Sequence, residues 1–223
     1  MAEMYRTGWE SPVQNTRETG GTDRRIGDIY ADRLMRTLGR ADLQGTRLLD
    51  FGAGRGDFLW SLAAAGAEVV GIDAYGWSYL QNQGLEAYPN TDSLNARDRF
   101  DGIVSVDVVE HLVRPWETLR NLKRHLADDG WLYVTTPNVQ SAAARLHRTD
   151  WKEARKPHHL LFFSPATLEQ TLRWAGLEAF QRLRWRVPYA RSRPRAILQM
   201  ALQMAGWDGQ LRYLARQGGA SAS

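Results

Sequence analysis

The feature that most constrains the fold of this chain is the glycine-rich stretch of residues 48–59, LLDFGAGRGDFL. An apolar run ends at an acidic residue, three glycines alternate with other residues, and an apolar helical pattern follows. This order predicts a short buried strand over 47–51, a tight turn and a helix. Glycine lets the backbone turn sharply and lets a ligand approach without a Cβ in the way. Because the free N–H groups of a helix N-terminus would lie over such a turn, the stretch indicates a nucleotide-type cofactor site.

The spacing of the glycines narrows the kind of cofactor. Gly52, Gly54 and Gly56 form G-x-G-x-G, whereas a dinucleotide fingerprint is G-x-G-x-x-G, and Asp57 stands in place of its third glycine. The chain has no G-x-x-x-x-G-K-[ST] sequence, which excludes a P-loop. A second acidic residue, Asp73, ends a second apolar run 21 positions after Gly52. A carboxylate there can accept hydrogen bonds from ribose hydroxyls, so we favour a cofactor site over a purely structural turn.

The sequence resembles the class I S-adenosylmethionine-dependent methyltransferases, in the group similar to the bacterial ubiquinone-biosynthesis O-methyltransferases. The resemblance covers about residues 45–180. The stretches that carry it are 48–56, 70–73, 100–112, 129–138 and 159–165. It implies S-adenosylmethionine as cofactor and an α/β fold, a doubly wound, mostly parallel sheet of seven strands in the order 3-2-1-4-5-7-6. The seventh strand would be antiparallel, and the ligand would lie over the carboxyl ends of strands one, two and four.

Hydrophobic periodicity predicts alternating strands and helices, as a doubly wound sheet requires. The expected strands are 47–51, 68–72, 85–88, 102–107, 131–136, 178–187 and 210–216. The expected helices are 23–40, 56–65, 76–83, 115–126, 165–175 and 194–205, with a helical patch at 141–147. The loop 89–99 departs from the usual family pattern, so the residue that contacts adenine is left open.

The domain organisation expected from the sequence is a single methyltransferase domain over 23–217. Residues 1–22 are polar and read as a flexible N-terminal arm or a lid, and 218–223 as a disordered tail. Residues 138–160 form a long insertion of the kind that often covers an active site. The chain has no cysteine and no apolar run of about 20 residues, so we expect no membrane span and a cytoplasmic protein.

The resemblance implies a set of cofactor-binding residues around the first two strands and after the fourth. They are Asp50, Gly52, Ala53, Gly54, Asp73, Ala74 and Asp107. For Asp50 the alternative is a carboxylate that only stabilises the turn, and both roles are compatible.

The strongest candidates for catalysis or metal binding are Asp107, Glu110 and His111, just past the fourth strand. Oxygen ligands with one imidazole could hold Mg²⁺ or a similar cation, as the resemblance implies. The alternatives are His111 acting as a base without metal, or a Glu-His pair that only supports the pocket. His159 stands before a Phe-Phe-Ser-Pro run and is the second candidate for acting on the acceptor. It could serve as a base or as a hydrogen-bond donor. The alternative is a histidine that only packs against its neighbours.

The function predicted from these residues is methylation of a hydroxyl of a small-molecule or glycan acceptor in a biosynthetic pathway. The alternatives are an RNA-modifying methyltransferase and a non-catalytic module that binds S-adenosylmethionine. A net charge of +4 and a group of arginines favour RNA. These arginines are Arg182, Arg184, Arg186, Arg191, Arg193 and Arg195. Because alternation along a strand would place the first three on one solvated face, we do not expect nucleic acid as the acceptor.

Overall fold

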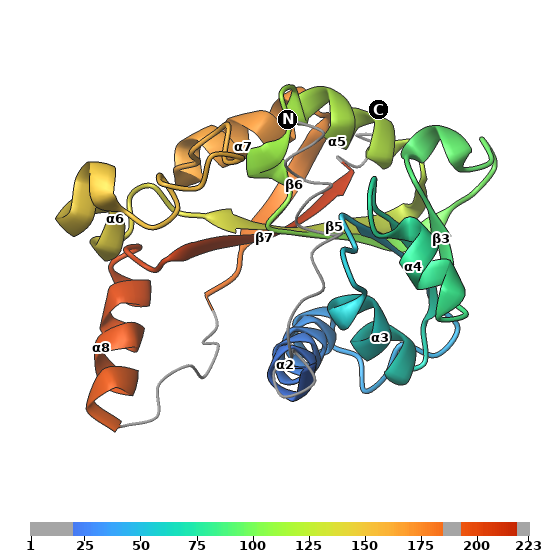
Figure 1. Cartoon of the computed structure of the whole chain (residues 1–223), viewed down its shortest axis with the longest axis horizontal. Coiled ribbons are helices and arrows are strands. Elements are labelled where there is room, and N and C mark those ends of the chain that lie inside the picture. Colours follow the sequence, from blue (N-terminus) through green and yellow to red (C-terminus); the bar gives the residue numbers. More distant parts are fainter. Residues whose placement is uncertain (1–19, 185–192, 218–223) are drawn as a thin grey trace, which may run out of the picture. The chain divides into compact units, whose positions relative to one another are not determined.

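The computed structural model describes residues 20–184 and 193–217 (Figure 1). Contacts between residues define two compact units, Met1–Val104 and Ser105–Ser223. The expected tail and residues 1–19 of the expected arm lie outside the described residues. Residues 20–22 are the start of a helix, and the single domain over 23–217 stays a prediction.

The strands form a seven-stranded sheet in the order β3-β2-β1-β4-β5-β7-β6, which confirms the predicted order. The parallel pairings β1–β2, β2–β3 and β1–β4 and the antiparallel pairings of β7 with β5 and β6 agree with a mostly parallel sheet. The strands are β1 Arg47–Phe51, β2 Glu68–Ile72, β3 Glu86–Tyr88, β4 Phe100–Val106, β5 Leu126–Pro137, β6 Leu177–Arg182 and β7 Gln210–Gln217.

Helices follow most strands, at or near the predicted positions. The α-helices are α2 Gly20–Leu38, α3 Asp57–Ala64, α4 Trp77–Asn82, α5 Pro115–Lys123, α6 Ala142–His147, α7 Pro165–Trp174 and α8 Arg193–Met204. Three single turns of 3₁₀ helix are η1 Thr91–Ser93, η2 Val109–His111 and η3 Arg148–Asp150. None of the helices in the described part of the chain combines the length and the apolar character that crossing a membrane requires.

The expected boundaries between α5 and β5 are wrong, and the strand expected over 178–187 ends at Arg182. The helix predicted over 115–126 ends at Lys123, and β5 begins at Leu126 instead of 131. Asp128, Asp129 and Gly130, a sequence typical of a helix stop, lie inside β5. At Gly130 a Cβ would stand only 2.8 Å from the carbonyl oxygen of Ala127, so the glycine permits a tight bend within the strand.

In the first unit, β1 and β2 carry the fully buried side chains that β-branched and leucine runs predict. Helix α2 lies against α3, as Figure 1 shows for the blue and the cyan helix. Their contact is close at Gly27, where a Cβ would lie 2.6 Å from the carbonyl oxygen of Asp57. The hydroxyl of Ser61 on α3 also donates a hydrogen bond of 2.8 Å to Asp28 on α2. The glycine therefore sets how near the two helices come.

In the second unit, β7 lies between β5 and β6 and supplies several buried side chains. Tyr213 of β7 is buried, and its hydroxyl donates a 2.8 Å hydrogen bond to Glu169 of α7. Helix α7 starts with a capping box, in which Ser164 accepts the N–H of Thr167 and the Thr167 hydroxyl accepts the N–H of Ser164. These bonds hold the N-terminus of α7, which follows the chain segment that contains His158 and His159.

Candidate functional site

The turn between β1 and α3 has the backbone shape that its glycines predict. Gly52, Gly54 and Gly56 have φ angles of 83°, 55° and 84°, in the left-handed region that side chains other than glycine rarely adopt. The N–H groups of Gly52 and Ala53 donate to the carbonyl oxygen of Ile72, at 2.7 and 3.0 Å. The turn is thus held against the end of β2.

The carboxylate of Asp73 holds this turn together. Its Oδ2 accepts the N–H of Gly54 at 2.9 Å, and its Oδ1 accepts the N–H groups of Tyr75 and Gly76 at 2.9 and 2.7 Å. A carboxylate has about four lone-pair sites, so Asp73 can organise the turn and still accept a hydrogen bond from a ligand. Ala74, which follows Asp73 and is also predicted to bind the cofactor, is exposed.

Asp50, at the end of β1, is a buried carboxylate. Only 3% of its surface is exposed. Burial, followed by repulsion from Asp73, raises the pKa of Asp50 to about 7. A buried acid whose pKa is strongly shifted is frequent at functional sites, although it also occurs in structural turns.

The turn fits the polar end of a cofactor. A Cβ placed on Gly54 would meet nothing within 4 Å, so the space above this glycine is open. The N-cap residue of α3 is Gly56, so no side chain of that residue caps the first turn. Five of the predicted cofactor residues, Asp50, Gly52, Ala53, Gly54 and Asp73, meet in this turn; their contact with the cofactor stays a prediction.

Asp107, the last of the predicted cofactor residues, lies in the second unit directly after β4, and Glu110 and His111 follow it. Asp107 has a φ of 56°, an uncommon value for a residue other than glycine. Its Oδ1 accepts hydrogen bonds from Gln210 Nε2 at 2.6 Å and from the Thr135 hydroxyl at 3.1 Å. These bonds to β5 and β7 hold the backbone in this conformation, and strained residues of this kind cluster at functional sites.

Glu110 is 1% exposed, and its Oε2 accepts a hydrogen bond of 2.9 Å from the hydroxyl of Thr136. Burial, with a smaller contribution from the charge of Asp107, raises the pKa of Glu110 to about 8. The side chain is therefore mostly a neutral carboxylic acid at pH 7. The backbone carbonyl oxygen of Glu110 accepts the N–H groups of Leu160 and Leu161, at 2.9 and 3.1 Å. The end of the long insertion therefore lies against η2.

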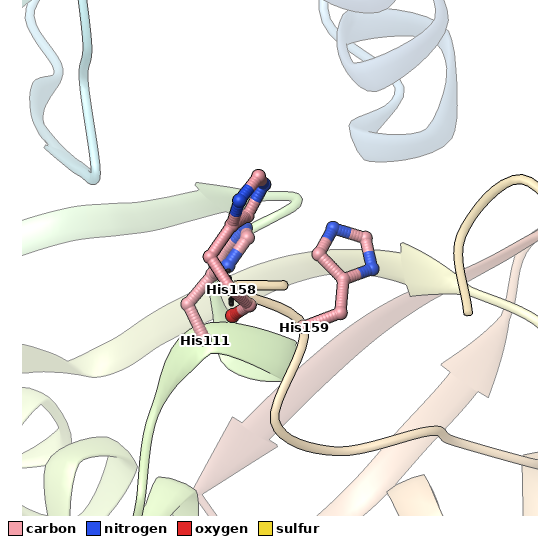
Figure 2. Close-up of side chains that lie close together, drawn as sticks. All are labelled: His111, His158 and His159. Atoms are coloured by element: carbon pink, nitrogen blue, oxygen red, sulfur yellow. Dashed lines mark hydrogen bonds between the residues drawn. The ribbon is translucent and has the colours of Figure 1, made fainter. Parts of the chain in front are cut away.

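This contact brings three histidines together, as Figure 2 shows. His111 comes from η2, and His158 and His159 come from the segment that crosses it. The His111 ring stacks on His158 with ring centroids 5.0 Å apart and contacts His159 edge-on at 4.8 Å. Because the carbonyl oxygen of His158 can only accept, His111 Nδ1, 2.9 Å away, carries a proton, so in the neutral imidazole the lone pair is on Nε2.

The surroundings of the histidines lower the pKa values of His158 and His159. Burial, with added repulsion from Lys156 and His111, lowers the pKa of His159 to about 4. Burial likewise lowers the pKa of His158, and the charges of His111 and Lys156 add to the effect. Lys156 is itself paired with Glu153, whose Oε2 lies 3.7 Å from His159 Nδ1. With so low a pKa, His159 is a poor proton acceptor at neutral pH and better suited to hydrogen bonding or metal ligation.

The structure therefore joins the predicted pair His111 and His159 and adds His158, which the sequence analysis left without a role. Two adjacent histidines were visible in the sequence, but nothing in it indicated that both would reach His111. Among residues 20–184 and 193–217, the one group of metal-ligating side chains that meets is His111, His158 and His159. Asp107 and Glu110 do not join His111 in such a group, and Mg²⁺ there stays a prediction.

The basic segment also differs from expectation. Arg182 was expected on a solvated face, but its side chain is only 16% exposed and forms an ion pair with Asp208 at 2.8 Å. The buried partner explains the difference, since an unpaired buried carboxylate would be costly. Arg184 is exposed, and Arg186 and Arg191 lie outside the described residues.

Comparison with known proteins shows two kinds of relative. A ubiquinone biosynthesis O-methyltransferase of Cereibacter sphaeroides is 32% identical over 155 residues, which are 62% of this chain and 63% of the relative. A tRNA U34 carboxymethyltransferase of Ectopseudomonas mendocina is 32% identical over 159 residues, which are 66% of this chain and 49% of the relative. The chain thus spans less than two thirds of the length of either protein.

Solved structures agree with the fold, and a family model covers most of the chain. A SAM-dependent methyltransferase from Archaeoglobus fulgidus matches with a TM-score of 0.61 and 18% identity, over 86% of this chain and 94% of that one. The family model described as a methyltransferase domain matches residues 22–181, which are most of the chain and include the glycine turn and the three histidines. The chain belongs to the class I S-adenosylmethionine-dependent methyltransferase family.

Proposed function

We propose that the chain transfers a methyl group from S-adenosylmethionine to a hydroxyl oxygen of a small molecule or glycan. When bound, the cofactor supplies a methyl group that its sulfonium has already activated. The protein then has to hold the acceptor and remove its proton. The observation that carries the hydroxyl acceptor is His111, whose Nδ1–H is fixed on the carbonyl oxygen of His158 and whose Nε2 carries the lone pair.

Each unit contributes one part of this proposal. The glycine turn and Asp73 hold the cofactor, with Asp50 and the N-terminus of α3 beside them. His111 accepts the proton of the acceptor hydroxyl, and His159, whose lowered pKa makes it a weak base, orients the acceptor by hydrogen bonding. The neutral Glu110 leaves the surroundings of His111 without an added negative charge at pH 7.

A nucleic-acid acceptor is the second candidate, because one relative is named a tRNA U34 carboxymethyltransferase. Arg182 is one of the arginines that favoured an RNA acceptor, but its ion pair with Asp208 keeps most of its side chain away from solvent. We therefore rank the small-molecule or glycan hydroxyl first. Incubating the protein with labelled S-adenosylmethionine and separate pools of tRNA, phenolic compounds and sugars, followed by mass spectrometry of the products, decides between them.

The cofactor part is tested with Asp73→Ala. Removing hydrogen bonds to a charged group costs roughly 1–3 kcal/mol, so we expect the variant to bind S-adenosylhomocysteine about 5- to 150-fold more weakly in calorimetry. Glu178→Ala, at an exposed carboxylate on β6, is the control and should bind S-adenosylhomocysteine as the wild type does. Equal cofactor affinity in the wild type and in Asp73→Ala would sink the assignment.

The acceptor part is tested with His111→Ala. A general base contributes typically about 10²–10⁴-fold in rate, so turnover should fall by that factor while the affinity for S-adenosylhomocysteine stays within about twofold. His147→Ala, at an exposed histidine on α6, should turn over normally. If His111→Ala turns over as fast as the wild type with the identified acceptor, His111 is not the base.

A further inference from the structure

We propose that His111, His158 and His159 form a binding site for one divalent transition-metal ion, Zn²⁺ in the first place. One nitrogen atom from each of the three rings lies within 4.8 Å of those from the other two. The chain has five histidines, and three of them meet at this one place although 47 positions separate His111 from His158.

The donor atoms determine which metal fits. Imidazole nitrogen suits Zn²⁺, Cu²⁺, Fe²⁺ and Ni²⁺, whereas Mg²⁺ requires oxygen ligands. Three histidines with a fourth position open is the ligand set of catalytic zinc sites. At Zn–N distances of about 2.0–2.1 Å, tetrahedral ligand nitrogens stand about 3.3 Å apart. The rings therefore have to close by about 1.5 Å, which rotation of the half-buried His111 and His158 side chains can provide.

Two of the rings are already oriented as metal-bound imidazoles are. His111 donates Nδ1–H to a backbone carbonyl oxygen, which directs the lone pair of Nε2 outward for coordination. In Figure 2 one nitrogen of His159 lies on the side of the other two rings and the second lies on the far side. His159 Nδ1 is buried, makes no hydrogen bond to another described residue, and faces Glu153 Oε2 at 3.7 Å. Coordination through Nε2 would make this a carboxylate–histidine–metal arrangement.

The charges around the cluster are compatible with a cation. The nearby positive charge of Lys156 is paired with Glu153, so the two largely offset each other. The proposal concerns binding of the ion alone, in the protein without acceptor, because the Nε2 lone pair of His111 cannot hold the ion and the acceptor's proton at once.

The test uses the full chain without an affinity tag, treated with a chelator and titrated with Zn²⁺ in calorimetry in the absence of cofactor. We expect one Zn²⁺ per chain, no binding of Mg²⁺, and the intense visible absorption of tetrahedral Co²⁺ when Co²⁺ replaces Zn²⁺. His158→Ala should weaken Zn²⁺ binding by at least about tenfold, and Glu153→Gln by about 10- to 100-fold through loss of the outer carboxylate.

His147→Ala is the control, because it removes one exposed histidine outside the cluster and should bind Zn²⁺ as the wild type does. His158 is half-buried, so His158→Ala should keep the fold, and an unchanged affinity for S-adenosylhomocysteine checks this. Absence of stoichiometric Zn²⁺ binding would overturn the proposal. So would equal binding in His158→Ala and the wild type, since the ion would then be held elsewhere on the surface.

Discussion

At the scale of single residues, the two carboxylates at the ends of β1 and β2 have opposite surroundings. Asp73 accepts three backbone N–H groups, whereas Asp50 is buried and is repelled by Asp73. A group whose pKa is higher in the folded state than in the unfolded chain binds more protons when folded. Folding stability therefore falls as the pH rises from the unfolded pKa to the folded one.

For Asp50 this window runs from about pH 4 to about pH 7. With about 1.4 kcal/mol for each pKa unit, the wild type loses at most about 4 kcal/mol of its free energy of unfolding across the window. Asp50→Asn lacks this loss, so its stability relative to the wild type should rise from pH 4 to pH 8. Urea unfolding at several pH values measures it, with Asp92→Asn as an exposed control. Parallel pH profiles for the wild type and Asp50→Asn would contradict the prediction.

At the scale of elements, the sequence predicts best where the chain alternates between short buried strands and glycine-ended helices. The limits of β1 and β2 agree with the prediction to the residue, because an apolar run between polar or glycine residues marks both ends. The end of α5 was misplaced because Asp128, Asp129 and Gly130 look like a helix stop but form a bend within β5. The histidine cluster was only half predicted. It depends on how the insertion crosses η2, and two hydrogen bonds to the Glu110 carbonyl oxygen decide that path.

The contact of α2 with α3 gives a prediction at this scale. In an open helix Gly27→Ala would stabilise by up to about 1 kcal/mol. Here the new Cβ would stand 2.6 Å from the backbone oxygen of Asp57, which cannot move aside as a flexible side chain would. We therefore expect a net loss of about 1–3 kcal/mol in the free energy of unfolding, as for an overpacked core.

Gly209→Ala is the matched control for this change. A Cβ at Gly209 would meet nothing within 4 Å, so its effect should stay within about 0.5 kcal/mol. Denaturant unfolding of both variants makes the comparison. A Gly27→Ala variant more stable than the wild type would mean that α2 is not held against α3 at this distance.

At the scale of the whole molecule, the chain places its cofactor turn in the first unit and its histidine cluster in the second. A ligand that binds only the folded protein stabilises it by about 2.7 kcal/mol at one hundred times its Kd. With S-adenosylhomocysteine alone, we expect slower hydrogen exchange at residues 50–56 and 73–76, where the N–H groups surround the proposed site. Asp73→Ala should show less slowing at the same ligand concentration, and exchange unchanged by the ligand in the wild type would contradict the site.

The hydrogen bond from Gln210 to Asp107 has a consequence for the time course of synthesis. The two residues are 103 positions apart, and Gln210 and Thr135 together support the left-handed backbone from which η2 and His111 follow. At about 5–20 residues per second, a ribosome makes Gln210 about 5–20 s after Asp107. In the second half of that interval the nascent chain carries all three histidines of the cluster but still lacks β7, whose Gln210 holds Asp107. A chaperone that shields residues 105–163 of the growing chain would therefore act on a segment whose final shape is settled only when β7 arrives.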